Sequence, residues 1–336
     1  MNRVSILGIG TELPPSVDVA EFAASKGADT RFYKSWKRAC QARDDNDQPS
    51  TMGSAALQKA LAQSGVDKNK IGLVLFTGVS RDYVPSWSVA TEVMRLNGMS
   101  DDCVGLDITI GCLATLSALD LAQGWLAQRT DRLVAIVAAE RWSHSVDKSD
   151  PSLAGMWVWA DGAAAMVLGM NTDPTRSCEK SLADFIGAEF TSCSDYNGHV
   201  LIPYGGTRLP VAPPGASPFA RTVSARPRDE VKQTYARGYR RAYDNISRRT
   251  CVRGEWLVCN QMSPQTIEMI AGTLGIAMDK VLLTGHDTGH LGAADVIVGL
   301  QRLHQAGGIK ESVVLGSSTA YAFGAGLVVP ALPTRA

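Results

Sequence analysis

Apolar runs of strand length alternate with amphipathic segments of helix length along most of the chain. Strands are predicted where apolar residues follow one another, at 4–7, 71–77, 104–110, 133–138 and 163–168. Helices are predicted where apolar positions recur at helical spacing, at 50–64, which opens on a Ser/Thr cap, and at 113–128. This alternation predicts an α/β fold in which helices cover a mostly parallel sheet.

The second half of the chain repeats this order of elements. Strands are predicted at 256–259, 280–284, 312–316 and 326–329, with helices at 264–274 and 293–306. We therefore expect two similar halves, one at 1–172 and the other at 173–336.

A proline-rich segment interrupts the pattern in the second half. Residues 201–228 contain six prolines and three glycines, a composition that predicts an irregular loop. Loops of this length in compact proteins are usually functional lids or mobile segments. A surface insertion without a role is the alternative.

Composition and charge narrow the class of protein. Of the 336 residues, 45% are hydrophobic and 20% charged, and the net charge is zero. This is ordinary globular composition and indicates neither a nucleic-acid nor a membrane partner. No apolar run reaches the roughly 20 residues that a membrane span needs, and the N-terminal run breaks at Gly8 and Gly10 as a strand rather than a signal peptide.

The seven cysteines are odd in number, scattered, and form no Cys-x-x-Cys pair. We therefore expect neither a disulfide framework nor a metal site. A cytoplasmic protein with reduced thiols and no bound cofactor is the expectation.

One cysteine stands where a strand meets a helix. Residues 107–112, Asp-Ile-Thr-Ile-Gly-Cys, end a predicted strand in a glycine turn and place Cys112 at the start of the next helix. The free N–H groups and positive partial charge of a helix N-terminus favour a nucleophilic thiolate and can bind an oxyanion. On spacing alone, a core position for Cys112 is the stronger interpretation.

Four segments carry motifs that occur together in one family. They are 50–54 (STMGS) followed by 65–74 (GVDKNKIGLV), 107–112 (DITIGC), 159–165 (WADGAAA) and 316–326 (GSSTAYAFGAG). In this order they resemble the early region, the nucleophile motif, the Gly-Asp-Gly-Ala turn and the C-terminal glycine-rich turn of the β-ketoacyl-acyl-carrier-protein synthase III family. The resemblance covers nearly the whole chain.

The resemblance implies both a fold and a chemistry. The family has a thiolase fold, in which two similar βαβαβ halves form five layers in the order α-β-α-β-α, and it forms homodimers. Its members transfer an acyl group from coenzyme A or an acyl carrier protein onto the cysteine, which is Cys112 here.

Two positions depart from the family pattern. Ketosynthases of the family have a histidine in a Val-Pro-His-Gln pattern, and residues 258–261 here are VCNQ, with Asn260 at that place. Their asparagine lies in a Gly-Asn-Thr-Ser-Ala-Ala pattern, and residues 289–294 here are GHLGAA, with His290 at that place. In a decarboxylating ketosynthase, the two side chains donate hydrogen bonds to the malonyl thioester carbonyl, so their loss weakens carbon–carbon bond formation.

His290 and Asp295, five residues later, instead suit general-base chemistry. A carboxylate can fix the tautomer of a histidine, and general-base assistance is worth about 10²–10⁴-fold in rate. The arrangement resembles a subgroup of synthase-III-like acyltransferases of antibiotic biosynthesis, which use a Cys-His-Asp or Ser-His-Asp triad. The resemblance implies Cys112 as nucleophile, His290 as base and Asp295 as its orienter. It places the backbone N–H groups of Cys112 and Thr319 in an oxyanion hole, and Asn260 is expected to hydrogen-bond a substrate.

Other assignments stay open on sequence alone. Asp295 could be a surface charge, Asp287 is an alternative orienter, and His286 is a second titratable group. Asp161 is expected to cap a turn. Three histidines carry no motif and are expected to be structural or exposed: His144, His199 and His304.

A basic stretch is the candidate docking surface for the acyl donor. Residues 226–253 contain nine Lys or Arg and three Asp or Glu. Helical spacing brings Lys232, Arg240 and Arg241 near one another, which suits an acidic carrier protein, although a solvated helix face has the same pattern.

The coenzyme contacts of the family are poorly matched. Gln265 stands where the family has an arginine for the donor phosphates, and residues 31–43 do not clearly preserve its adenine-stacking Trp and Arg. A carrier-protein donor is therefore favoured over coenzyme A.

Three hypotheses about function, each from a different functional class, fit the sequence. The leading one is a ping-pong acyltransferase that moves an acyl or aryl-acyl group through Cys112 to a hydroxyl or amine of a secondary-metabolite intermediate. The alternative is a β-ketoacyl synthase III that makes a carbon–carbon bond to start polyketide or fatty-acid synthesis. The third is a non-catalytic partner subunit with the same fold.

Overall fold

The computed structural model describes residues 3–83, 86–170, 181–216 and 221–331. Its largest element is a nine-stranded sheet with the strand order β11-β12-β13-β8-β1-β7-β6-β4-β5. In chain order its strands are β1 (Val4–Glu12), β4 (Ile71–Thr77), β5 (Val104–Ile108), β6 (Leu133–Arg141), β7 (Asp161–Met170), β8 (Ala183–Ser192), β11 (Trp256–Cys259), β12 (Val313–Ser318) and β13 (Ala322–Val329). Three residue pairs at Val4–Ile6 join β1 to β8, and the sheet divides there into two parts.

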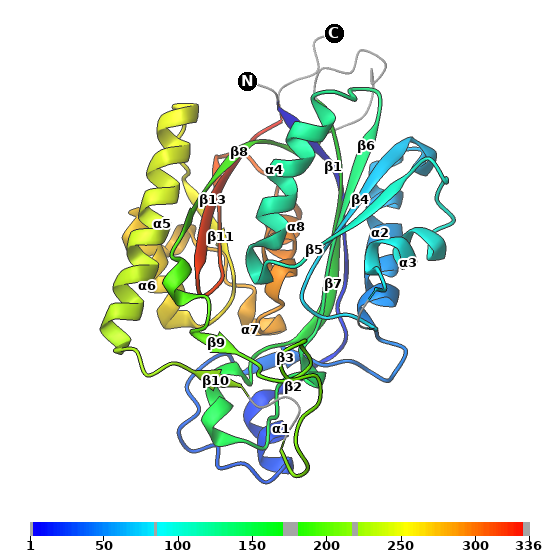
Figure 1. Cartoon of the computed structure of the whole chain (residues 1–336). Helices are drawn as coiled ribbons and strands as arrows, with labels where there is room; N and C mark the ends of the chain where they lie inside the picture. The colour runs from blue at the N-terminus through cyan, green and yellow to red at the C-terminus, as the bar shows by residue number, and fades with distance from the viewer. Residues whose placement is uncertain (1–2, 84–85, 171–180, 217–220, 332–336) are drawn as a thin grey trace.

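Two helices lie between the parts of the sheet, α4 (Ala114–Leu126) and α8 (Asp295–Gln305) (Figure 1). The outer face of the β1-β7-β6-β4-β5 part is covered by α2 and α3, and that of the other part by α5 and α6. These four helices are α2 (Pro49–Ser64), α3 (Val89–Leu96), α5 (Arg228–Thr250) and α6 (Pro264–Leu274). The resulting five layers, α-β-α-β-α, agree with the fold that the resemblance implies.

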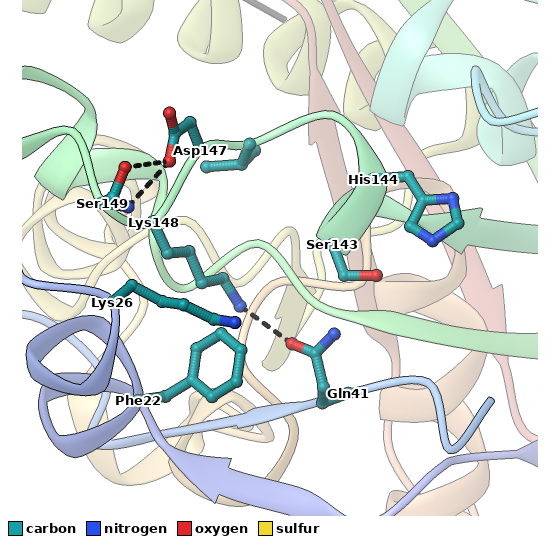
Figure 2. A pocket seen from close by; sticks show the side chains of 9 residues that line it. Phe22, Lys26, Gln41, Ser143, His144, Asp147, Lys148 and Ser149 are labelled. Carbon is teal, nitrogen blue, oxygen red and sulfur yellow. Dashed lines mark hydrogen bonds between the residues drawn. The ribbon is translucent and has the colours of Figure 1, made fainter.

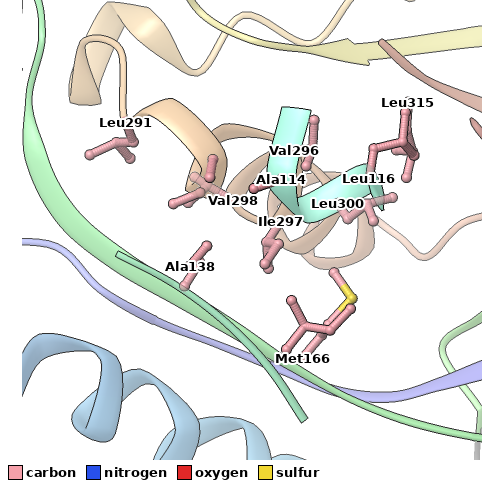
Figure 3. Close-up of a cluster of buried hydrophobic side chains, with 14 of the residues drawn as sticks. Ala114, Leu116, Ala138, Met166, Leu291, Val296, Ile297, Val298, Leu300 and Leu315 are labelled. Atoms are coloured by element: carbon pink, nitrogen blue, oxygen red, sulfur yellow. The ribbon is translucent and has the colours of Figure 1, made fainter. Parts of the chain in front are cut away.

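Apolar side chains between the layers fix the two central helices. Leu116 of α4 and Ile297 and Leu300 of α8 are fully buried, and they gather with Met166 of β7 and Leu315 of β12 in one cluster (Figure 3). Full burial of such a side chain contributes about 1.5–3 kcal/mol. The ends of α4 and α8 are therefore held rigidly with respect to each other.

The two parts of the sheet share one topology. In one part, β4 pairs in parallel with β5 and β6. In the other, β11 pairs in parallel with β12 on one side. On its other side it forms a single parallel bridge to Val281, in the segment before α7 (Gly285–Thr288). Antiparallel strands then complete each part, β7 and β1 in one and β13 and β8 in the other. The correspondence puts Cys112 and His290 at the same ends of the two central helices. The predicted boundary at 172–173 lies outside the described residues.

Two predictions about strands are wrong. The sheet is mixed rather than mostly parallel, because β12 and β13 are joined by three residues, 319–321, whereas a parallel crossover needs a dozen or more. The strand predicted at 280–284 is reduced to the bridge at Val281, since α7 begins immediately afterwards, at Gly285. The predicted bounds of β4, β11 and α6 match the structure.

Smaller elements lie at the lower end of the molecule in Figure 1, below the sheet. They are β2 (Ser16–Asp18), α1 (Val19–Ser25), β3 (Arg38–Cys40), β9 (Val200–Leu201) and β10 (Thr222–Val223). Apart from β9 and β10, the described residues of the 201–228 segment up to Pro227 are irregular, as predicted.

Candidate active site

Cys112 lies in a sharp turn between β5 and α4. Gly111 has φ +57°, and a Cβ there would lie 2.9 Å from Cγ2 of Thr319, so the position requires glycine. Cys112 follows within the short 3₁₀ turn η2 (Gly111–Leu113) that leads into α4. Its N–H belongs to a first helical turn, where no acceptor exists within the helix, and is free to bind an oxyanion.

His290 faces Cys112 from the beginning of the second central helix. Its Nε2 lies 3.4 Å from Sγ of Cys112, and its Nδ1 lies 2.6 Å from Oδ2 of Asp295. A carboxylate only accepts hydrogen bonds, so Nδ1 carries a proton and Nε2 is directed at the sulfur. The three residues therefore have the geometry of a nucleophile, a base and an orienting acid.

Asp295 is fully buried in the first turn of α8. Besides His290, its carboxylate accepts N–H groups of Gln261 at 2.7 Å and Leu291 at 2.9 Å. Asp287 is instead exposed and pairs with Arg302 at 3.5 Å. The structure thus places Asp295, and not Asp287, beside His290.

Opposing effects set the protonation of His290. Burial lowers its pKa, but the charges of Asp295 and Cys112 and the hydrogen bonds to them outweigh burial and hold that pKa well above its usual range. The protonated form of His290 is therefore favoured when no acyl group is bound.

The backbone of His290 is fixed by a parallel bridge to Trp159. Its N–H donates to the carbonyl of Val158, and its carbonyl accepts the N–H of Ala160, both at 2.9 Å. The Trp159 ring meets the His290 ring edge-on, with centroids 5.9 Å apart. The position of the imidazole thus depends on the turn before β7 as well as on the segment before α8.

Asn260 lies at the end of β11 and is fully buried. Its Nδ2 donates to the carbonyl of Gly292 at 2.9 Å, and its Oδ1 accepts the N–H of Ser318 at 3.1 Å and the hydroxyl of Ser317 at 2.7 Å. These bonds join β11, β12 and the turn after His290. They indicate a positioning role in place of the expected contact with a substrate.

The backbone of Thr319 is not available for an oxyanion hole. Its N–H donates to the carbonyl of Ala322 at 2.8 Å and closes the turn between β12 and β13. The predicted role is therefore wrong for this group, although the Thr319 side chain lies against Gly111, next to Cys112.

Asp161 is buried at the start of β7. Its side chain binds backbone groups of two other segments and does not cap its own turn as predicted. Its carboxylate accepts the N–H of Ala42 at 2.7 Å and that of Ser143 at 2.8 Å. It therefore ties the segment after β3 to the turn after β6.

Three further residues near the triad were not predicted as site residues from the sequence. Glu140, at the end of β6, is fully buried and accepts Val79 N–H, Ser80 N–H and the Ser80 hydroxyl. Burial raises the pKa of Glu140 to about 7 against these hydrogen bonds. Trp159 and Arg221 complete the group, with the guanidinium carbon 4.6 Å from the indole centroid.

The predicted donor-docking residues are exposed on the outer helix α5. Lys232, Arg240 and Arg241 all reach solvent, and Gln265 is exposed in the first turn of α6. They are available to a partner, and the structure does not bring them to the triad.

The remaining histidines lie apart from the triad. His286 is exposed and edge-on to Trp36, and Nδ1 of His199 lies 2.5 Å from the Ser224 hydroxyl. His304 is on α8 with Nδ1 buried, and His144 lies in the turn after β6. None of them is in hydrogen-bond contact with Cys112 or Asp295 in the described structure.

A basic cavity of about 770 Å³ opens between α1 and residues 143–149. Figure 2 shows Lys26 and Lys148 beside the ring of Phe22; their ammonium nitrogens lie 5.5 and 5.3 Å from its centroid. Lys148 is buried, donates to Oε1 of Gln41 at 3.3 Å, and has its pKa lowered by that burial. The cavity is not lined by Cys112, His290 or Asp295.

Within the described residues, no group of three or more His, Cys, Asp or Glu side chains could hold a metal ion. No described helix is both long and apolar enough to cross a membrane.

Two family models match the parts of the chain that form this site. The model of 3-oxoacyl-[acyl-carrier-protein (ACP)] synthase III matches residues 106–183, which contain Cys112. The model of the C-terminal part of that synthase matches residues 254–335, which contain His290 and Asp295. Over these two segments the chain is similar to 3-oxoacyl-[acyl-carrier-protein (ACP)] synthase III.

Individual members of the family are similar over most of their length. The β-ketoacyl-[acyl-carrier-protein] synthase III of Neisseria meningitidis serogroup B is 27% identical over 293 residues, which cover 84% of this chain and 85% of that protein. The structure of the 3-oxoacyl-(acyl carrier protein) synthase III of Xanthomonas oryzae superposes with a TM-score of 0.82 at 20% identity and covers 98% of this chain and all of its own. The priming β-ketosynthase of the R1128 polyketide pathway gives 0.83 at 20% identity, covering 98% of this chain and 97% of that one. These family members support the thiolase fold.

Proposed function

We propose that the protein is an acyltransferase that carries an acyl group as a thioester on Cys112 and passes it to a hydroxyl or amine. The observation that carries the proposal is the row Cys112–His290–Asp295, in which a partly exposed thiol meets two buried side chains with contacts of 3.4 and 2.6 Å. As the resemblance implies, we expect the acceptor to be an intermediate of secondary metabolism.

The first half-reaction loads the cysteine. Sγ of Cys112 attacks the thioester carbonyl of the donor, and the Cys112 N–H, at the start of a helix, stabilises the oxyanion that forms. The carbon–sulfur bond of the donor then breaks. His290, protonated in the free enzyme, gives its Nε2 proton to the departing thiol.

The second half-reaction transfers the acyl group from Cys112 to the acceptor. Neutral His290 takes the proton of the acceptor hydroxyl or amine through Nε2 as the acceptor attacks the acyl-Cys112 carbonyl. The bond between the acyl carbon and Sγ breaks, and the sulfur leaves as a charged group beside the new imidazolium. Asp295 stabilises this imidazolium through Nδ1.

The alternative is a β-ketoacyl synthase, and it is favoured by the similarity to proteins of Neisseria meningitidis and Xanthomonas oryzae that bear this name. Against it, the Asn260 amide is engaged with Gly292, Ser317 and Ser318, so it is not presented to a malonyl carbonyl. His290 also has an acidic partner, which suits proton removal from an acceptor.

Product analysis decides between the two. The protein is loaded with butyryl thioesters of a carrier protein and of coenzyme A, and the adduct is followed by intact-protein mass spectrometry. Alcohols, amines or malonyl-carrier protein are then added. We expect an ester or amide and faster loading from the carrier protein, whose acidic surface complements α5. Carbon dioxide release with a new carbon–carbon bond would instead identify a ketosynthase.

We also propose that two copies of the chain form a homodimer through β5. This strand is the last in the sheet order, so one of its edges is unpaired within the described chain. Val104 and Leu106 on it are 55% and 50% exposed, which is high for apolar strand residues. A second copy would pair with the edge and cover both side chains.

Leu106→Arg is expected to raise the dimer dissociation constant at least about tenfold, since a twofold axis brings two added charges together. Analytical ultracentrifugation over a range of concentrations measures the change. Met278→Lys, which alters another exposed apolar residue, serves as the control. A wild-type protein that stays monomeric at all concentrations would contradict the dimer.

A further inference from the structure

Arg221 lies next to the base but takes no part in the reaction described above. It is the residue before β10, in the proline-rich segment. Its guanidinium carbon is 4.6 Å from the Trp159 ring centroid and 5.7 Å from that of Trp142, and Trp159 meets His290 edge-on. One indole ring therefore separates the guanidinium from the imidazole.

The charge of Arg221 has no counterion in the described structure. Its Nη2 makes two long contacts with Ser145, 3.3 Å to the carbonyl and 3.4 Å to the hydroxyl, and its Nε is buried without a partner. No carboxylate of the described residues lies within salt-bridge distance. The acid that acts on it is Glu140, whose carboxyl is already held by Val79 and Ser80.

A partly buried guanidinium without an anion is unfavourable, and its planar fork matches a carboxylate. Stacking on Trp159 uses one face of the group and leaves its N–H edge for such a partner. Arg221 is thus oriented for an anion that the described residues do not supply.

Ser145, which Arg221 contacts, also lines a cavity whose charged lining residues are basic. The cavity measures about 620 Å³, and its wall includes the segment after β4, the end of β6 and residues between 202 and 212. Arg81 and Arg141 line it, and no Asp or Glu does so among the described residues. Arg141 is buried, and its Nε and Nη1 have no partner there. Arg81 is paired with Asp107, and Arg141 is paired through its Nη2 with Asp45 at 3.4 Å. Among these three arginines, Arg221 alone has no ion-pair partner within the described residues.

We propose that Arg221 binds a carboxylate carried by one of the two substrates. This inference rests on the proposed function and specifies its substrate class. The carboxylate belongs either to the acyl group, which would then be a dicarboxylic half-thioester, or to the acceptor. The proline-rich segment supplies both Arg221 and part of the cavity wall, which gives it a role in substrate selection.

Matched substrate pairs test the assignment in each half-reaction. Loading of Cys112 is compared for succinyl- and butyryl-coenzyme A, and unloading of the butyryl enzyme is compared for 4-hydroxybutanoate and 1-butanol. The wild type is expected to prefer the carboxylated member in one of the two comparisons. Arg221→Gln reduces that preference about 10- to 100-fold, the effect of one charge-assisted hydrogen bond, and acts mainly on KM.

Two control variants accompany this change. Arg221→Lys keeps the charge and is expected to restore part of the preference, whereas Arg208→Gln alters an exposed arginine of the same segment and leaves it unchanged. No carboxylate preference in either half-reaction, or a preference unaffected in Arg221→Gln, would overturn the assignment.

A binding measurement separates this inference from the proposed function. Glutarate is expected to raise the melting temperature of the wild type and of Arg208→Gln, but not that of Arg221→Gln. Butyryl loading of Cys112 without any effect of glutarate or Arg221 would contradict the carboxylate site alone. Stabilisation by glutarate without loading of Cys112 would contradict the acyl-transfer proposal alone.

Discussion

Replacing Asp295 with asparagine is expected to slow transfer of the acyl group from Cys112 by about 10²–10⁴-fold. The carboxylate keeps the proton of His290 on Nδ1 and leaves Nε2 facing the sulfur. An asparagine amide can donate to Nδ1, which puts the imidazole proton on Nε2 and removes the base. Single-turnover transfer from pre-acylated enzyme, followed by intact-protein mass spectrometry, measures the loss.

Asp287→Asn is the matched control. This residue lies in the same segment but is exposed and pairs with Arg302, so its loss should leave the transfer rate within about twofold, the scale of a weak surface ion pair. Equal losses in the two variants, or wild-type transfer by Asp295→Asn, would show that Asp295 does not orient the base.

The pH profile distinguishes this role from a structural one. The charges of Asp295 and Cys112 raise the pKa of His290 against the effect of burial. In the acyl-enzyme Cys112 is an uncharged thioester, so His290 loses its proton at a lower pH than in the free enzyme. Transfer by the wild type should therefore rise with pH through this pKa and level off above it. In Asp295→Asn the rise in rate should move to lower pH, because the carboxylate charge that raises the pKa of His290 is also gone. A general loss of structure would instead lower the rate without shifting the pH at which it rises.

The sequence predicts the parts of this molecule that depend on local patterns. The run at 71–77 and the helix at 264–274 match β4 and α6 because their periodicity and caps lie within a few residues. Cys112, His290 and Asp295 could be proposed together because the resemblance to acyltransferases with a Cys-His-Asp triad implies all three, and the structure brings them into contact.

Contacts between distant segments escape such patterns. The Thr319 N–H is used by a turn whose closure depends on the pairing of β12 with β13. Asn260 looked available to a substrate, yet three partners from two other segments occupy its amide. Arg221 meets Trp159 across more than sixty positions of the chain, and no periodicity relates the two. Sequence reasoning therefore named the three residues of the proposed triad and missed the contacts that distant segments make around them.

Replacing Cys112 with alanine is expected to abolish the acyl adduct and to lower overall transfer by about 10⁴–10⁶-fold, the range seen when a covalent nucleophile is removed. The fold should persist, because the Cys112 carbonyl and not its side chain accepts the Ser317 hydroxyl at 2.7 Å. Intact-protein mass spectrometry after exposure to carrier-protein and coenzyme A thioesters reports the adduct directly. Cys193→Ala, at another partly exposed thiol, is the control and should load normally.

The Cys112 and Asp295 variants together divide the reaction into its two steps. A ping-pong enzyme exchanges its acyl group with free donor thiol in the absence of acceptor, and Cys112→Ala should lose this exchange completely. Asp295→Asn keeps the nucleophile and should form the adduct, but release it slowly to the acceptor. An adduct that survives in Cys112→Ala would place the acyl group on another residue. A wild-type protein that forms no adduct with either class of thioester would favour the non-catalytic partner subunit, in which the buried contact between Cys112 and His290 has no chemical use.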